Sequence, residues 1–274
     1  MRKRIAFLSS LIALAVSFRA DASVLFNQTA IQQIAEETAS LHAVQADDER
    51  TSLKRFHINL GHNFIGLFKS ANVEPLVVGS TSAAISASED QNLHNYFKTE
   101  NTDGILTTTG ATLGKPYLVA PAVFGLLLYG HHSSSRHFRT FTYALAQAYT
   151  INLGLTAALK AATRRERPDQ SNDHSFPSGH AADSFMAATV ISKYYGRKAT
   201  FIAYTAAGFI SFSRVKRDVH WMSDIVAGAT LGYIVGRTAA AGTGLPSTEP
   251  HVSWMPMLNP GHRSVGLALA IRLP

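Results

Sequence analysis

Two short stretches decide the fold of this chain: His174–Asp183, which reads HSFPSGHAAD, and Ser213–Asp224, which reads SRVKRDVHWMSD. Among their residues are His180 and His220, the carboxylate of Asp224, the guanidinium of Arg214 and the pair Ser178-Gly179. These are groups that bind and stabilise the charge of a phosphate. The fold must therefore bring the two stretches together.

In the first stretch, the run Pro177–His180 precedes an Ala-rich segment of helical character, so it predicts a helix start. The backbone N–H groups of a helix start bind anions. Ser178 is of the N-cap type, and this capping role is its purely structural interpretation. Gly179 lets the backbone approach an anion closely because it has no Cβ. His180 would then lie at the edge of the anion site.

In the second stretch, His220 and Asp224 are four residues apart, which is about one helical turn. The carboxylate can orient one imidazole nitrogen and leave the other to act as a nucleophile or base. The structural alternative is a helix-stabilising pair worth a few tenths of a kcal/mol. Arg214 adds a planar guanidinium whose geometry suits phosphate oxygens.

A third stretch, from Lys160 to Pro168, adds further cations. Lys160 and Arg167 are seven residues apart, so on a helix they share a face about 10 Å apart along the axis. Arg164 is predicted on that face and Arg165 is not. Pro168 disfavours helical geometry at the residue before it, which places Arg167 at a frayed helix end.

The combination K-x6-RP, PSGH and SR-x5-H-x3-D, in this order, resembles the type-2 phosphatidic acid phosphatase and vanadium haloperoxidase superfamily. The resemblance covers roughly residues 105–240, and the flanking segments look like the bacterial phosphatase branch. It implies a phosphatase that needs no metal and no cofactor. Its substrates would be phosphate monoesters or lipid (pyro)phosphates, hydrolysed through a phosphohistidine intermediate.

The resemblance also implies a role for each site residue. His220 would attack phosphorus, Asp224 would orient it, and His180 would protonate the leaving oxygen and then activate water. The remaining residues would hold the phosphate oxygens: Lys160, Arg167, Ser178, Gly179 and Arg214.

Two other functions stay open at this point. Haloperoxidases hold vanadate in a similar pocket, so the chain could be a vanadium-dependent oxidoreductase. A non-enzymatic envelope protein that keeps a phosphate-binding pocket is the third reading.

Composition and pattern predict a mainly α-helical bundle of the acid phosphatase/haloperoxidase type. The chain is 46% hydrophobic and 16% charged with a mean hydropathy of +0.04, between soluble and polytopic membrane proteins. Thr140–Leu159 has no charged side chain and is either a buried central helix or a membrane span. Further helices are predicted over 181–195, 199–213 and 221–240, with a break at Gly196.

The two ends of the chain differ from this core. Met1–Ala22 has the basic, apolar and small-residue regions of a secretory signal peptide, with an uncleaved anchor as the alternative. At the other end, apolar residues alternate from Val265 to Leu273, and Asn259-Pro260-Gly261 is a turn signal. This pattern predicts a C-terminal β-hairpin that packs on the bundle or on a partner.

Charge and cysteine content limit the kinds of ligand and of catalysis that the chain can have. Removing residues 1–22 takes away four Lys/Arg and one Asp, so the formal net charge falls from +7 to +4. The remaining basic residues cluster near the motifs, which indicates a small anionic or lipid substrate and not a nucleic acid. The chain has no cysteine, so thiolate catalysis is excluded. We expect an exported, periplasmic protein that associates with a membrane if its substrate is a lipid.

The predicted organisation has four segments. They are a signal peptide over 1–22, an N-terminal helical extension over 23–104, a phosphatase core over 105–240, and a tail over 241–274.

Overall fold

The computed structural model describes residues 35–38, 51–98, 104, 108–110, 112 and 114–243, with the backbone of 251–259 and 264–272. The chain divides into two units, Met1–Glu49 and Arg50–Pro274. In the first unit the described residues form a single helical turn, 35–38. The predicted signal peptide over 1–22 lies outside the described residues.

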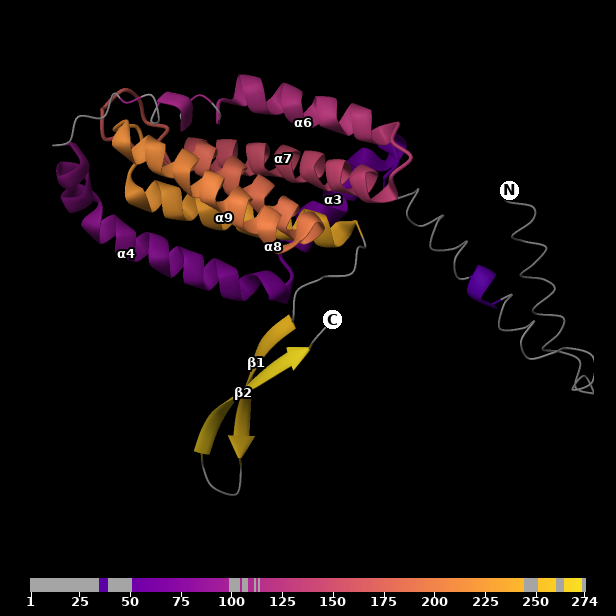
Figure 1. The fold of residues 1–274 in the computed structure, drawn as a ribbon. Helices are drawn as coiled ribbons and strands as arrows, with labels where there is room; N and C mark the ends of the chain where they lie inside the picture. The colour runs from indigo at the N-terminus through magenta and orange to yellow at the C-terminus, as the bar shows by residue number, and fades with distance from the viewer. Residues whose placement is uncertain are drawn as a thin grey trace, which may run out of the picture. The chain divides into compact units, whose positions relative to one another are not determined.

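The second unit contains a bundle of α-helices, which confirms the mainly α prediction (Figure 1). Two short 3-10 turns, η2 and η3, flank the first of its helices. The elements in chain order are η2 (Leu53–Arg55), α3 (Phe56–Gly66), η3 (Ser70–Asn72), α4 (Val73–Lys98), α6 (Pro116–His131), α7 (Arg136–Thr163), α8 (Gly179–Lys216) and α9 (Met222–Gly242).

Helix α7 is the centre of the bundle. It contacts α6 on one side and both α8 and α9 on the other, and α4 lies along α9 (Figure 1). Its uncharged stretch supplies fully buried side chains such as Tyr143, Ala144 and Tyr149. Among the helices that the structure describes, none combines the length and the apolar character needed to cross a bilayer.

Close packing between α8 and α9 positions the two motif stretches. Gly228, Gly232 and Gly236 recur every four residues on α9, which places them on one face. A Cβ on Gly228 would lie 2.5 Å from the Ser178 carbonyl oxygen, and one on Gly232 would lie 2.2 Å from that of Ala182. Because these glycines lack a Cβ, the backbones come close enough to set the start of α9 beside the start of α8.

Two features of the helices bear on the sequence predictions. The expected break at Gly196 is confirmed, since this residue has φ +72° and divides α8 into two helical parts. The predicted helical extension over 23–104 includes α4, which continues through polar residues as far as Lys98. Among these polar residues, Asp90 is buried.

The tail contains two strands, β1 (His251–Asn259) and β2 (Ser264–Arg272). They pair antiparallel, with His251 opposite Arg272 and Asn259 opposite Ser264. The packing of this pair on the bundle or on a partner stays a prediction.

Candidate active site

A cavity of about 290 Å³ lies where α7 ends and α8 begins. Six of the eight predicted site residues line it: Lys160, Arg167, Gly179, His180, Arg214 and His220. The other two, Ser178 and Asp224, are fully buried, and a hydrogen bond of 3.0 Å from the Ser178 N–H to the Asp224 carbonyl oxygen joins them. The fold therefore gathers all three motif stretches around one cavity.

The start of α8 forms one wall of this cavity. Ser178 is the N-cap, and its hydroxyl accepts a hydrogen bond of 3.5 Å from the Ala181 N–H. Gly179 is the first residue of the helix and faces the cavity. The predicted helix start at PSGH is confirmed, and it provides N–H groups of the kind that bind anions.

His220 and Asp224 lie against each other, as their four-residue spacing predicted. The Nδ1 atom of His220 is 3.5 Å from Oδ2 of Asp224 and has no closer polar partner. This separation is long for a hydrogen bond, and such contacts in unliganded active sites often shorten when substrate binds. The pair leaves Nε2 of His220 as the nitrogen available to the cavity.

The surroundings of this pair favour a neutral imidazole beside an ionised carboxylate. Burial lowers the pKa of His220 to about 4, the adjacent Asp224 carboxylate opposes this shift, and the Lys160 charge adds to it. Burial alone would raise the pKa of Asp224. The contact with His220, a hydrogen bond from Ser175 and the Arg165 charge outweigh burial and hold the pKa of Asp224 below its usual value. At neutral pH the imidazole therefore keeps its lone pair.

Three cations converge on the cavity. Burial lowers the pKa of Lys160 to about 8, and the charge of Arg167 lowers it further. Burial also lowers the pKa of Arg214 to about 10, with repulsion from Arg217 and Arg167 adding to the shift. The buried Nε atoms of Arg167 and Arg214 have no hydrogen-bond partner. Together these groups are arranged to receive an anion.

The predicted positions of the basic residues after Lys160 need correction. Helix α7 ends at Thr163, and Arg164 adopts a left-handed conformation with φ 45°. The helical face expected to hold Lys160, Arg164 and Arg167 therefore does not continue. Arg167 still reaches the cavity through the loop, Arg164 is exposed, and Arg165 turns inward.

Arg165, which was predicted to lie off the face of Lys160, holds the carboxylate of Asp224 in place. Its Nη1 atom lies 2.7 Å from Oδ1 of Asp224 and 2.6 Å from the Ser223 hydroxyl. Its Nη2 atom lies 2.7 Å from Oδ2 of Asp90 on α4. The Ser223 N–H donates to the other oxygen of Asp90 at 3.0 Å. One arginine thus links α4 to the start of α9.

Two more features of the cavity were missed. A Cβ on Gly114 would lie 2.3 Å from Cδ2 of His180, so only glycine lets this segment pack against the imidazole. Asp183 and Thr156 also line the cavity. The sequence could have indicated both residues, because Asp183 lies one helical turn from His180 and Thr156 lies one helical turn from Lys160. Among the residues that the structure describes, no three His, Cys, Asp or Glu side chains gather as a metal site requires.

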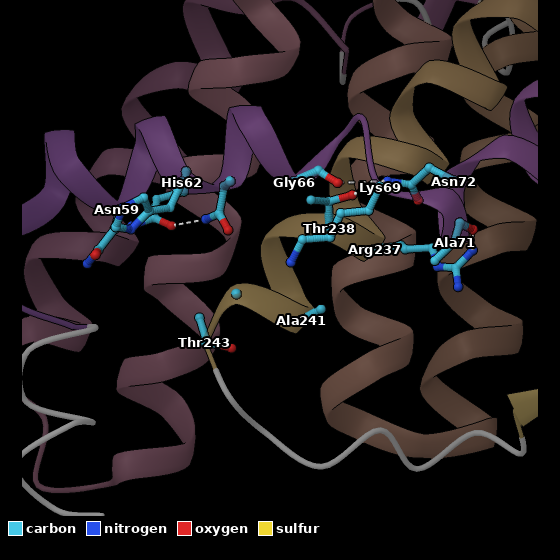
Figure 2. Close-up of a pocket in the computed structure, with 13 residues that line it drawn as sticks. Asn59, His62, Gly66, Lys69, Ala71, Asn72, Arg237, Thr238, Ala241 and Thr243 are labelled. Atoms are coloured by element: carbon cyan, nitrogen blue, oxygen red, sulfur yellow. Dashed lines mark hydrogen bonds between the residues drawn. The ribbon is translucent and has the colours of Figure 1, made fainter. Parts of the chain in front are cut away.

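Figure 2 shows a second cavity, of about 430 Å³, between α3, η3 and the C-terminal end of α9. The asparagine side chains that line this cavity form hydrogen bonds to other protein groups. Asn63 donates to Gln147, and Asn72 donates to the Gly66 carbonyl oxygen at 3.2 Å and to the Thr238 hydroxyl at 3.0 Å. None of the predicted site residues lines this cavity.

The chain resembles phosphatases over part of its length. A family model described as the PAP2 superfamily matches residues 161–243. A lipid A 1-phosphatase from Porphyromonas gingivalis is 32% identical over 111 residues, which is 39% of this chain and 25% of that protein. A PA-phosphatase related-family protein from Dictyostelium discoideum is 27% identical over 150 residues, 43% of this chain and 55% of that one. The chain thus spans between a quarter and about half the length of these relatives.

Solved structures of two bacterial proteins are also similar. A PAP2-type phosphatidylglycerolphosphate phosphatase from Bacillus subtilis matches with a TM-score of 0.53 and 18% identity, over 62% of this chain and 94% of that one. Aquifex aeolicus LpxE matches with a TM-score of 0.47 and 23% identity, over 55% and 93% of the two chains. The first of these likenesses supports the shared helical fold.

The contacts of Arg165 predict a large stability difference between two neighbouring arginines. Arg165→Gln leaves the buried Asp90 and Asp224 carboxylates without their cation, so we expect a loss of roughly 3 kcal/mol or more in unfolding free energy. Arg164→Gln, at an exposed position, should change it by less than about 0.5 kcal/mol. Urea unfolding of both variants at neutral pH measures this difference.

The pH dependence of the stability lost in Arg165→Gln tests whether the loss comes from the Asp224 carboxylate. The pKa of Asp224 is lowered in the folded protein, so its contribution is present above the unfolded pKa of about 4 and is lost as the pH falls. The gap between wild type and Arg165→Gln should therefore narrow at acidic pH. Equal effects of Arg165→Gln and Arg164→Gln on stability would contradict the role given to Arg165. A stability difference between wild type and Arg165→Gln that does not change with pH would contradict it too.

Proposed function

We propose that the chain is a phosphatase of the PAP2 superfamily, whose family model matches residues 161–243, and that it hydrolyses lipid phosphate monoesters through a phosphohistidine on His220. The observation that carries the proposal is the single cavity in which a buried neutral imidazole faces three cations and a helix start. That arrangement combines a nucleophile with groups that bind the phosphate it attacks.

In the first step, Nε2 of His220 attacks phosphorus in line with the ester oxygen. A P–N bond forms, the P–O bond to the alcohol breaks, and His180 gives its proton to the leaving oxygen. Asp224 stabilises the positive charge that develops on the imidazole. Its carboxylate is suited to this role because Arg165, Ser175 and the Trp221 N–H keep it fixed and ionised.

In the second step, water replaces His220 on phosphorus. His180, now neutral, removes a proton from the water, the P–N bond breaks, and inorganic phosphate leaves. His180 lies in the same cavity as His220, at the start of α8. Both steps therefore use the same pair of histidines in opposite roles.

The remaining residues stabilise charge on the phosphoryl oxygens. Lys160, Arg167 and Arg214 bring three positive charges to one small cavity, and the Gly179 N–H adds a neutral donor. In phosphoryl transfer the charge in the transition state is spread over three equatorial oxygens. Donors that are already in place for those oxygens avoid the cost of reorganisation during reaction.

A lipid phosphate is the substrate class that we favour. Leu153 and Pro116 line the cavity, and the neighbouring Tyr117 and Leu118 on α6 are exposed apolar side chains. Such clustered apolar surface suits an acyl chain or a membrane surface. The names of the similar proteins, a lipid A 1-phosphatase and a phosphatidylglycerolphosphate phosphatase, agree with this class. Export by residues 1–22, followed by membrane association, is part of the same proposal.

Substitution of the proposed nucleophile tests the function directly. His220→Gln should lower the release of phosphate from a monoester by at least about a thousandfold, since it removes the attacking nitrogen. His174→Gln is the matched control, because this exposed side chain pairs with Asp173 and is absent from the cavity lining. Phosphate release by purified protein is the measurement, and a His220→Gln variant with most of its activity would rule out the mechanism.

The lowered pKa of Lys160 predicts a change in substrate affinity near pH 8. Above this pH the side chain loses its proton, so the cavity loses one of its three charges and KM rises several-fold. Because the bound dianion holds the proton on Lys160, kcat should change little. Phosphate monoesters are already dianions above about pH 7, so the substrate does not titrate in this range.

Lys160→Arg supplies the control for this prediction, since an arginine stays charged at every pH used. Its KM should stay flat between pH 7 and 9.5. The assignment fails if the wild-type KM is flat too, or if the arginine variant shows the same rise.

A further inference from the structure

Beyond the phosphate-binding residues, the cavity has a second polar wall. Asp183 follows His180 by three residues on α8, and Thr156 precedes Lys160 by four residues on α7. Residues at these spacings share a helix face, about one turn apart. Because α8 starts at the cavity and α7 ends there, both residues lie one turn deeper in the bundle than the phosphate site.

The polar groups of this wall are buried and incompletely bonded. The Thr156 hydroxyl has no hydrogen-bond partner although the residue is only 7% exposed. Asn152, one further turn along α7, donates to Oδ1 of Asp183 at 2.7 Å, while its own Oδ1 has no partner. Most buried polar groups in proteins are hydrogen-bonded, so the Thr156 hydroxyl left open at the cavity indicates a bound molecule or ordered water.

The charge of this wall determines what can bind there. Burial raises the pKa of Asp183 to about 6, so its carboxyl is mostly ionised at neutral pH. A carboxylate repels phosphate oxygens, and it therefore faces the part of the substrate that is not the phosphate. It needs hydrogen-bond donors, and a hydroxyl group can donate to it while also bonding to the Thr156 hydroxyl.

We propose that Asp183 and Thr156 form a subsite for a leaving alcohol that carries a further hydroxyl group, as glycerol and sugars do. The inference rests on the proposed function, in which His180 protonates the leaving oxygen. Since Asp183 lies one turn from His180 on the same face, a hydroxyl near the ester oxygen comes within its reach. Asn152 holds the carboxyl of Asp183 and is a positioning residue.

This subsite should make the enzyme select polyol phosphates over simple alkyl phosphates. A site built to bond a hydroxyl loses affinity for a molecule without it, because the buried groups of the site are then left unpaired. The apolar Leu153 and Ala157, which line the same cavity, leave room for the rest of the molecule.

The experiment compares glycerol 1-phosphate with n-propyl phosphate, which has the same chain length and no hydroxyl. We expect the wild-type kcat/KM to favour glycerol 1-phosphate by about tenfold or more, equivalent to roughly 1.4 kcal/mol. Asp183→Asn and Thr156→Val should each lower this ratio at least about threefold. In both variants, kcat/KM should fall less for n-propyl phosphate than for glycerol 1-phosphate.

Thr150→Val is the matched control, because its hydroxyl bonds within α7 to the Ala146 carbonyl oxygen and is absent from the cavity lining. Its ratio should equal that of wild type. Thr156→Val removes a hydroxyl that has no partner, so this variant should fold even if Asp183→Asn does not. An equal wild-type kcat/KM for the two esters, or variants that lower both alike, overturns the subsite.

Failure of the proposed function would look different, since neither ester would then be hydrolysed. In that case, dissociation constants for the two phosphates, measured by calorimetry on wild type and on Thr156→Val, still test the subsite. A tighter glycerol 1-phosphate complex that depends on Thr156 supports it. Equal dissociation constants show that the wall holds only water and overturn it.

Discussion

The buried carboxylate of Asp224 is the group on which the rest of the site depends. A carboxylate without any exposure is costly unless donors surround it. Here they come from separate segments of the chain: Arg165 after α7, Ser175 before α8, and the Trp221 N–H at the start of α9. Because one side chain gathers these segments, the need to stabilise a buried charge also sets the geometry of the cavity.

The same constraint explains why α4 matters to a site that it does not line. Asp90 on α4 bonds both Arg165 and the Ser223 N–H, so it fixes the cation that neutralises Asp224. The guanidinium is shared between two carboxylates, and this sharing keeps it from moving toward the cavity. The cavity's own cations are then left to bind substrate, and a bound anion would relieve the repulsion between them that lowers the pKa of Lys160 and of Arg214.

Local spacing predicted the parts of the site that lie within one helical turn. The N-cap at Ser178 follows from its residue type before a helical segment, and the structure has it. His220 and Asp224 also lie against each other as predicted, although His220 precedes the N-cap of α9 and is not part of that helix. The position of Arg165 could not be predicted in this way, because α7 ends in a left-handed C-cap at Arg164, a conformation that is usual for glycine and that an arginine does not signal. Asp90 was missed for a related reason, since its contacts join residues far apart in sequence. Asp183 follows His180 by three residues, which places the two on one helix face. Spacing alone did not mark it as a site residue, because a polar residue on a helix usually faces solvent.

The central claim, that His220 carries the phosphoryl group, is tested most directly by trapping the intermediate. A phosphate monoester labelled on phosphorus is mixed with the enzyme and quenched in alkaline denaturant after a few milliseconds. We predict an acid-labile, base-stable label on the peptide that contains His220, and none in His220→Gln. A label on His180, or an acid-stable label on Ser178, would contradict the account.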